Sequence, residues 1–228
     1  MALTSLARRA VLRTYPADQR TLSGVRYEAA RVKALVSTRL RRTPDAELLH
    51  LGCGGRRVEG WLNCDLSGSD YDIDLMAGRL PFRTGSVRAV VMQHVIEHLE
   101  LREHLLPLLS ELRRVLTDDG AVWLSCPDLE KVCVSYVEDR GRTLLEDRRS
   151  RYPAFTLGGV PTQHIVNDLF HQRGGHRNLF DFDLLAWALE EAGFSKVERV
   201  KEGDLLSVFP EFPERRDDAQ SLYVVAQP

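Results

Sequence analysis

Four short apolar runs in the first half of the chain each lead to residue types that suit a cofactor site. In an open α/β sheet the carboxyl ends of the strands lie at one edge, and ligands bind in the crevice there. Glycine turns and carboxylates at successive strand ends therefore predict a site for a nucleoside-containing cofactor. The runs end, in chain order, at Gly52 with Gly54, at Asp65, at Asp74 and at Met92.

Each of these residue types has a use in such a site. Gly52 and Gly54 let the backbone turn sharply and approach a ligand without a Cβ in the way. The Asp65 carboxylate can accept hydrogen bonds from both hydroxyls of a ribose. Asp74 can accept one from an adenine amino group, while the Leu75 amide faces the ring.

The segment 94–98 reads HVIEH, the HxxEH pattern of the inverted zinc proteases. That chemistry requires a helix with both histidines on one face, whereas this segment directly follows a predicted strand. We therefore expect Gln93 and His94 to lie beside the cofactor, and Glu97 and His98 to start a helix and pack. No metal ion is expected.

The elements that must position these residues alternate between strands and helices, as hydrophobic periodicity and glycine or proline breaks indicate. This alternation predicts an α/β fold with a doubly wound, mostly parallel sheet of seven strands. The last two strands have no long helix between them, so we expect antiparallel pairing at an edge. The predicted strands are 47–51, 61–65, 71–75, 87–92, 121–126, 196–201 and 221–226, and the predicted helices are 26–42, 103–116, 129–149 and 181–192.

Two helices carry further expectations. In the helix 26–42 an apolar stripe is formed by Val32, Leu35, Val36 and Leu40. Pro107 is compatible with the helix 103–116 only in its first turn, where a missing N–H is tolerated.

Composition limits the class of protein. A chain of 228 residues suits one α/β domain. A net charge of −2 without a basic block does not favour a nucleic-acid partner. The four cysteines form no CxxC pair and are expected as free thiols of a cytoplasmic protein. No apolar run approaches the roughly 18 residues that a membrane span needs.

We expect an N-terminal helical extension over 1–42 and a domain over 43–228, with the loop-rich segment 151–178 as a lid and acceptor-site insertion. The first 14 residues are rich in arginine and free of acids, as in a transit peptide. A short amphipathic helix that packs on the domain is the favoured interpretation, because arginine is frequent throughout the chain.

An ordered set of motifs resembles the class I S-adenosylmethionine-dependent methyltransferases. The resemblance is greatest to a short bacterial, type-11-like subgroup often associated with cell-surface glycan and secondary-metabolite pathways. It covers roughly residues 47–200. The motifs are LHLGCGG (49–55), GWLNCDL (60–66), DL (74–75), LPF (80–82), HVIEHL (94–99), RRVLTDDG (113–120) and AGF (192–194).

The resemblance implies a Rossmann-like sheet and S-adenosyl-L-methionine as cofactor. Leu80 and Phe82 either cover the adenine or belong to the core. The cofactor-binding residues that it implies are His50, Gly52, Cys53, Gly54, Asp65, Leu66, Asp74, Leu75, Gln93 and His94.

Three departures from the family pattern affect the site. The family usually has an acidic residue two positions before the first glycine, where this chain has His50, so backbone carbonyls around Gly52 become candidates to hold the cofactor's amino group. Arg56 replaces a third glycine. Gly52 and Asp65 are only 13 residues apart, against about 20 in a dinucleotide fingerprint. The helix between those strands must be a turn or absent, which disfavours a pyrophosphate-containing cofactor.

The segment 161–180 concentrates histidines between glycine-rich turns. In the family this region lies over the mouth of the cofactor pocket, so His171 or His176 is the predicted proton acceptor on the acceptor side. The alternative is a polar surface loop in which His176 and Arg177 cap a helix near Asp181.

The predicted function is methyl transfer to oxygen or nitrogen of a small molecule, sugar or glycan precursor, by a cytoplasmic monomer or homodimer. Two alternatives stay open. One is a non-catalytic partner or regulatory protein with the same fold, and the other is an NAD-dependent enzyme on a similar sheet.

Overall fold

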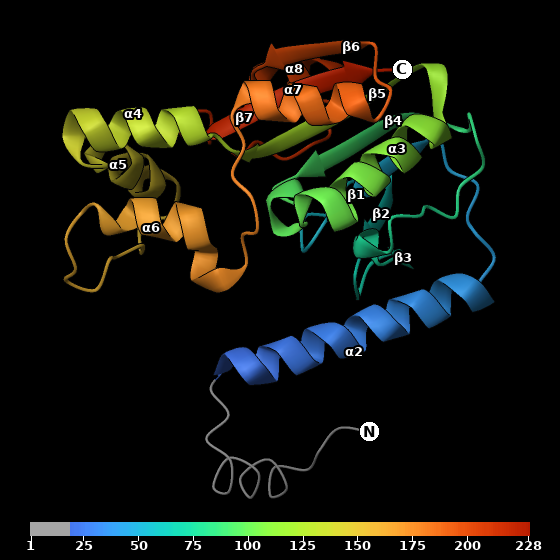
Figure 1. Ribbon diagram of the computed structural model, residues 1–228, viewed down its shortest axis with the longest axis horizontal. Helices are drawn as coiled ribbons and strands as arrows, with labels where there is room; N and C mark the ends of the chain where they lie inside the picture. The colour runs from blue at the N-terminus through green and yellow to red at the C-terminus, as the bar shows by residue number, and fades with distance from the viewer. Residues whose placement is uncertain (1–18) are drawn as a thin grey trace, which may run out of the picture.

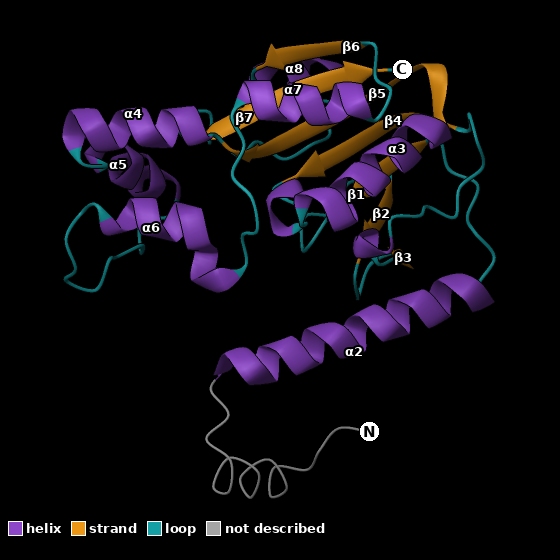
Figure 2. Cartoon of the chain, viewed as in Figure 1, coloured by secondary structure: helices purple, strands orange, loops and turns teal. Residues whose placement is uncertain are grey.

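The computed structural model describes residues 19–228, so the predicted transit peptide or amphipathic helix at 1–14 lies outside the described residues. A single sheet of seven strands runs through the domain in the order β3-β2-β1-β4-β5-β7-β6 (Figures 1 and 2). Its strands are β1 (Leu48–Leu51), β2 (Leu62–Asp65), β3 (Tyr71–Asp72), β4 (Val87–Gln93), β5 (Leu116–Pro127), β6 (Lys196–Val200) and β7 (Ser221–Gln227).

The predicted doubly wound, mostly parallel sheet is confirmed. Strands β1 to β5 pair in parallel. Strand β7 inserts between β5 and β6 and runs antiparallel to both. The expected antiparallel pairing therefore involves the last two strands, with the antiparallel strand one place in from the edge.

Helices cover both faces of the sheet. The α-helices are α2 (Gln19–Leu40), α3 (Leu106–Val115), α4 (Leu129–Asp139), α5 (Arg142–Arg151), α6 (His164–His171), α7 (Phe182–Glu191) and α8 (Glu202–Val208). The short helices are η1 (Leu75–Ala77), η2 (Ile96–His98), the π-helix η3 (Leu101–Leu105) and η4 (Gln172–Gly174).

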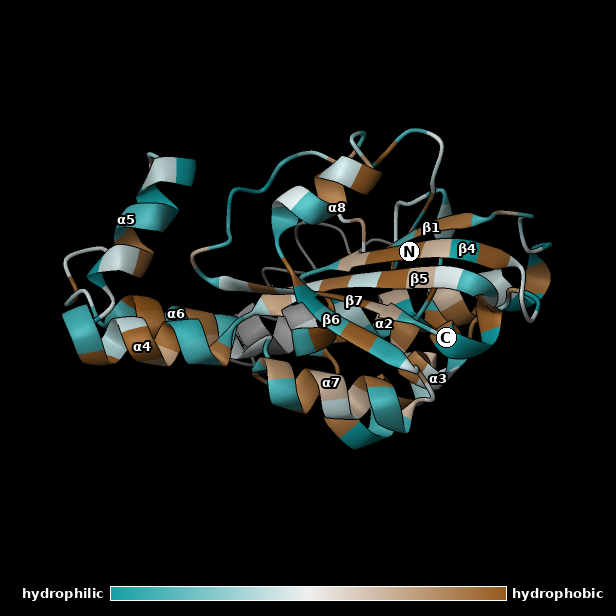
Figure 3. Ribbon diagram, turned by 90° about the horizontal axis from the view of Figure 1, so that it is seen from above, coloured by the Kyte–Doolittle hydropathy of each residue, from teal (hydrophilic) through white to brown (hydrophobic). Residues whose placement is uncertain are grey.

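Strand β4 shows how the sequence builds this layering. Its side chains alternate between the two faces. Val90 and Met92 join the main core with α3 and α7. Ala89 and Val91 join a second cluster with residues of α8. Figure 3 shows α3 and α7 on one side of these apolar strands and α8 on the other.

Several predicted elements differ from the observed ones. The predicted helix 129–149 is two helices, because Arg140 and Gly141 adopt left-handed backbone angles between α4 and α5. The loop-rich segment 151–178 contains α6, and the stretch after β6 contains α8. Pro107 lies in the first turn of α3, as predicted.

Helix α2 docks by a face other than its apolar stripe. Val32 and Leu40 are 60% and 81% exposed, whereas Ala34 is fully buried. The Thr38 hydroxyl lies 3.3 Å from the Asp72 carbonyl oxygen. The helix therefore meets the domain near β3 through small and polar side chains.

None of the helices within residues 19–228 is long and apolar enough to cross a membrane.

The four cysteines are free, and only Cys133 is exposed. Burial raises the pKa of Cys53 to about 11, so its thiol stays protonated and unreactive at neutral pH.

We expect one fast-reacting thiol per native chain with a chromogenic disulfide reagent, and four after unfolding. Cys133→Ser should remove the fast phase. A second fast thiol in the native protein would contradict the burial of Cys53, Cys64 and Cys126.

Candidate functional site

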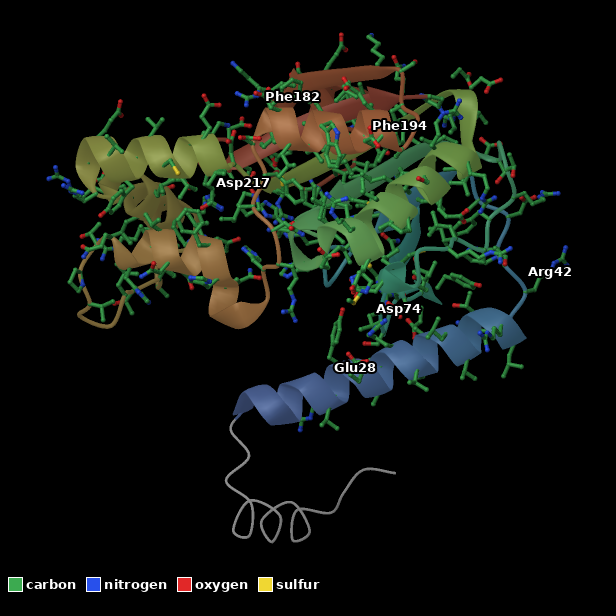
Figure 4. All side chains as sticks on the ribbon, in the orientation of Figure 1. Glu28, Arg42, Asp74, Phe182, Phe194 and Asp217 are labelled. Atoms are coloured by element: carbon green, nitrogen blue, oxygen red, sulfur yellow. The ribbon has the colours of Figure 1, made fainter. Side chains whose placement is uncertain are left out.

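A cavity of about 210 Å³ lies at the carboxyl ends of β1, β2 and β4, where the sequence predicted a cofactor. Its wall is formed by residues at or just after the ends of β1, β2, β3 and β4. Helix α2 contributes the Tyr27 side chain. Figure 4 shows Asp74 on the side of the domain that faces α2. The lining residues are Tyr27, Gly52, Asp65, Leu66, Ile73, Asp74, Leu75, Met76, His94, Val95, His98 and Leu99.

The glycine turn after β1 shapes one wall of this cavity. Gly52 and Gly54 have φ angles of 71° and 54°, which glycine adopts without strain. A Cβ on Gly52 would overlap the Cγ2 atom of Val95, whereas one on Gly54 would meet no atom within 4 Å. The backbone at Gly52 therefore lies so close to Val95, which follows β4, that only glycine fits at this position.

Asp65 holds this turn and also lines the cavity. One carboxylate oxygen accepts a hydrogen bond of 2.7 Å from the Gly54 amide, and the other accepts one of 2.6 Å from the Leu66 amide. Each carboxylate oxygen can accept a further bond. Asp65 can thus bind ligand hydroxyls while it keeps the loop in place.

Asp74 has a partner that the sequence did not predict. Its carboxylate is buried and lies 3.0 Å from Nε of Arg31 in α2, while its other oxygen caps η1 through the Met76 amide. The hydroxyl of Tyr27 donates to the Met76 sulfur at 3.0 Å. Arg31 and Tyr27 thus attach the N-terminal helix to the end of the cavity where adenine recognition was predicted.

His94 lies between two buried carboxylates. Its Nδ1 is 3.2 Å from Glu97 Oε1, and its Nε2 is 2.9 Å from Asp217 Oδ2. Burial acts to lower the pKa of His94, but the hydrogen bonds to Asp217 and Glu97 outweigh burial and raise it. The raised pKa favours the imidazolium form, in which both ring nitrogens donate to the two carboxylates.

Asp217, which precedes β7, has additional partners. Its carboxylate accepts a 2.6 Å hydrogen bond from Tyr223 and lies 3.2 Å from Nε of Arg215. Burial acts to raise the pKa of Asp217, but the contact with His94 outweighs it and leaves the pKa well below its ordinary value. Asp217 is 123 residues from His94 along the chain, so no local pattern could have indicated the pair.

A second cavity of about 330 Å³ adjoins the first, and His94 and His98 line both. Its wall comes from the strand ends, from the segment before β7 and from the helices α5 and α6. The labelled Asp217 marks where these parts meet (Figure 4). The lining residues are His94, His98, Pro127, Arg148, Arg151, Tyr152, Phe155, Asp168, Leu169, Gln172, His176, Arg215, Asp217 and Gln220.

The structure separates the two histidines predicted for the acceptor side. His176 lines the second cavity, and its Nδ1 lies 2.6 Å from the Leu169 carbonyl oxygen. His171 is exposed and lines a different surface cavity with His164. Of the two alternative candidates, His176 is therefore the one that lines the cavity beside the first, because His171 ends α6 on its exposed side.

Several residues predicted to bind the cofactor do not line the first cavity. His50 is buried, with its ring 3.2 Å from the Asn63 side chain and edge-on to Phe212. Cys53 and Gln93 are also buried away from it, and Gly54 acts through its bond to Asp65. Leu80 and Phe82 belong to the core.

The cavity suits a nucleoside without a pyrophosphate. Among the described residues, only turns connect β1 to β2, so no helix N-terminus faces the glycine turn to bind phosphate. Gly52 lines the cavity, and the absence of a Cβ there lets Val95 pack against the turn. Carboxylates at Asp65 and Asp74 offer acceptors for hydroxyl and amino groups. These features fit S-adenosylmethionine.

The two glycines give a matched pair of variants. Gly54→Ala should cost about 1–2 kcal/mol of unfolding free energy, the strain of a left-handed alanine. Gly52→Ala should cost about 1–3 kcal/mol more, because its Cβ overlaps Val95. Urea denaturation of both variants measures the difference. Equal losses would contradict the close packing at Gly52.

The buried pair of Asp217 and His94 predicts a pH dependence. Because the folded pKa of Asp217 lies below its unfolded value of about 3.9, the stabilisation is present above that value and is lost as the pH falls. His94 stays protonated in this range. Asp217→Asn should cost on the order of 3 kcal/mol at pH 6.

The cost of Asp217→Asn should shrink below about pH 4, as measured by denaturant unfolding at several pH values. Asp45→Asn, in an exposed pair with Arg83, is the control and should change stability by less than about 1 kcal/mol. A cost for Asp217→Asn that does not vary between pH 6 and pH 3 would rule out the ionised pair.

A comparison with models of protein families found one match, which covers part of the chain. Residues 49–124 match the model of a family described as a methyltransferase domain. The comparison with curated proteins found no match.

Several solved structures are similar to this chain at low identity and with TM-scores below 0.5. A SAM-dependent methyltransferase from Archaeoglobus fulgidus is 16% identical, with 92% of this chain and 100% of that chain covered and a TM-score of 0.44. One from Mesorhizobium loti is 18% identical, with 87% and 98% covered and a TM-score of 0.43. Phosphoethanolamine N-methyltransferase 2 from Haemonchus contortus, solved with S-adenosyl-L-methionine, is 13% identical, with 86% and 52% covered and a TM-score of 0.43.

The matched segment contains the glycine turn, Asp65, Asp74 and His94, all at the carboxyl edge of the mixed seven-stranded sheet. With a cavity there that fits the cofactor, residues 49–124 match a methyltransferase domain.

Proposed function

We propose that the chain transfers a methyl group from S-adenosylmethionine to an oxygen or nitrogen atom of a small molecule or sugar, glycan precursors included. The observation that carries this proposal is the wall shared by the two cavities, because His94 and His98 line both. A cofactor in one cavity and an acceptor in the other would meet at these residues.

S-adenosylmethionine, when bound, supplies a methyl group that its sulfonium already activates. The protein therefore has to orient the acceptor and exclude water, and positioning alone can supply much of the rate. Gly52, Asp65, Leu66, Asp74 and Leu75 are the proposed cofactor contacts. His94 holds Glu97 and Asp217 in place at the junction.

The second cavity supports an acceptor that carries an anionic group. Arg148, Arg151 and Arg215 line it. Arg148 is held in place, since it lies 2.9 Å from Asp168 and 5.4 Å above the Phe155 ring. An ordered guanidinium can bind a phosphate or carboxylate in two-point geometry.

The helices α4 to α6 with the loops around them, residues 129–178, are the proposed acceptor-site insertion, a longer segment than 151–178. They enclose a small apolar cluster of their own, so they can carry acceptor residues without disturbing the sheet. His176 is the proposed acceptor-side histidine. Burial lowers its pKa, which favours the neutral ring, in which one nitrogen keeps a lone pair for a proton or a metal ion. His171 is assigned no role in transfer.

The test is a transfer assay with S-adenosylmethionine carrying an isotopically labelled methyl group. The acceptors are matched pairs of sugars and amines, each with and without a phosphate or carboxylate. We expect labelled product, detected by mass spectrometry, from the anionic member of a pair. Binding of S-adenosylhomocysteine without transfer to any acceptor would favour the non-catalytic partner protein instead.

Cofactor binding gives a direct prediction. Asp65→Ala should weaken binding of S-adenosylhomocysteine by about 1–3 kcal/mol, because charge-assisted hydrogen bonds to the ribose are lost. Calorimetric titration measures the affinity, and NADH serves as a ligand that should not bind. Asp45→Ala, at an exposed position, should bind like the wild type. Unchanged affinity in folded Asp65→Ala would remove Asp65 from the site.

A further inference from the structure

Three side chains beside the shared wall have the composition of a metal site. Glu97 and His98 come from η2, and His176 follows η4. One possible ligand atom from each lies within 4.8 Å of the other two. We propose that Glu97, His98 and His176 form a binding site for a divalent transition-metal cation at the junction of the two cavities.

Two polar atoms of these side chains are buried and lack a partner within the described part of the chain. They are Glu97 Oε2 and His176 Nε2. Glu97 is only 1% exposed, and its other oxygen is the one that contacts His94. A buried polar atom without a partner is costly, and a cation between these two atoms and His98 would satisfy both.

Backbone contacts hold both histidine rings in the orientation that a metal ligand needs. Nδ1 of His98 lies 3.1 Å from the Gly175 carbonyl oxygen, and Nδ1 of His176 lies 2.6 Å from that of Leu169. A carbonyl only accepts, so in each neutral ring Nδ1 donates and Nε2 keeps its lone pair. Metal-binding histidines typically have such an outer partner.

The two segments that supply the ligands are also joined to each other. The Glu97 carbonyl oxygen accepts hydrogen bonds from the Arg177 amide at 2.7 Å and from the Asn178 amide at 3.2 Å. His176 is therefore fixed next to η2 by the residues that follow it. The ligand set is in place before any ion arrives, which reduces the cost of binding.

Two imidazoles and one carboxylate suit Zn²⁺, Mn²⁺, Fe²⁺ or Co²⁺ better than Mg²⁺ or Ca²⁺, which favour oxygen ligands. Three protein ligands leave positions open, as in catalytic metal sites. His98 and His176 line the acceptor cavity, so an acceptor oxygen can fill an open position and be polarised there. The site itself stands on the geometry alone, whereas its part in transfer rests on the proposed function.

A second cluster, Glu100, Glu103 and His104, provides the internal control. There the Glu100 carboxylate already caps η3 through the Glu103 amide at 2.6 Å, and the cluster is nearer the surface. Capping accounts for the position of the Glu100 carboxylate without a metal ion.

The experiment measures metal binding without cofactor or acceptor. Tag-free protein is stripped with a chelator and titrated with Co²⁺, whose visible absorption reports coordination by protein ligands, and with Zn²⁺ by calorimetry. We expect one equivalent to bind, with affinity about tenfold or more lower in His176→Ala and Glu97→Gln. His104→Ala should bind like the wild type. Circular dichroism checks folding, and if Glu97→Gln does not fold, His176→Ala decides.

Absence of stoichiometric binding would overturn the proposal, and so would binding that His176→Ala leaves intact or that His104→Ala abolishes. If binding fails while labelled methyl transfer is observed, only the metal site is wrong. If the metal binds and no acceptor is methylated, the metal site stands and the proposed function fails.

Discussion

The charged contact of His94 with Glu97 and Asp217 is the interaction on which the arrangement of the site depends. A buried carboxylate is stable only when a partner compensates it, and here one imidazolium serves two of them. The contact connects the end of β4 to the segment before β7. Because His94 lines both cavities, the same contact lies at the boundary between them.

A second ionic contact attaches the N-terminal helix α2 to the wall of the first cavity. Arg31 compensates the buried carboxylate of Asp74, and Tyr27 lines the cavity beside it. An adenine amino group that approaches Asp74 would share this carboxylate with Arg31. In the proposed site, the Asp74 side chain would thus couple docking of α2 to recognition of the cofactor.

Local patterns predicted the sheet and the cofactor edge well. The glycine turn, the short connection to Asp65 and the strand before His94 all depend on residues close together in the chain. Arg31 and Asp217 could not be found in this way, because their partners lie 43 and 123 residues away. The short helices α6 and α8 were missed since they lie in segments of mixed polar and apolar residues.

Other features of the structure depend on tertiary contacts. The stripe with Val32 and Leu40 is apolar, yet the face with Ala34 docks because Arg31 pairs with Asp74. His171 and His176 are five residues apart, but the turn after α6 brings only His176 to the acceptor cavity. His176 joins His98 only in the folded chain, so the segment HVIEH alone could not indicate the proposed metal site.

The central claim is that one cavity holds the cofactor and the adjoining cavity holds the acceptor, with His94 and His98 between them. A crystal structure of the full chain with S-adenosylhomocysteine tests this claim most directly. The account predicts the ribose on Asp65, the adenine beside Asp74 and Leu75, and the sulfur end next to His94 and His98. S-adenosylhomocysteine bound in the cavity lined by Arg148 and Asp168, or away from Asp65, would contradict it.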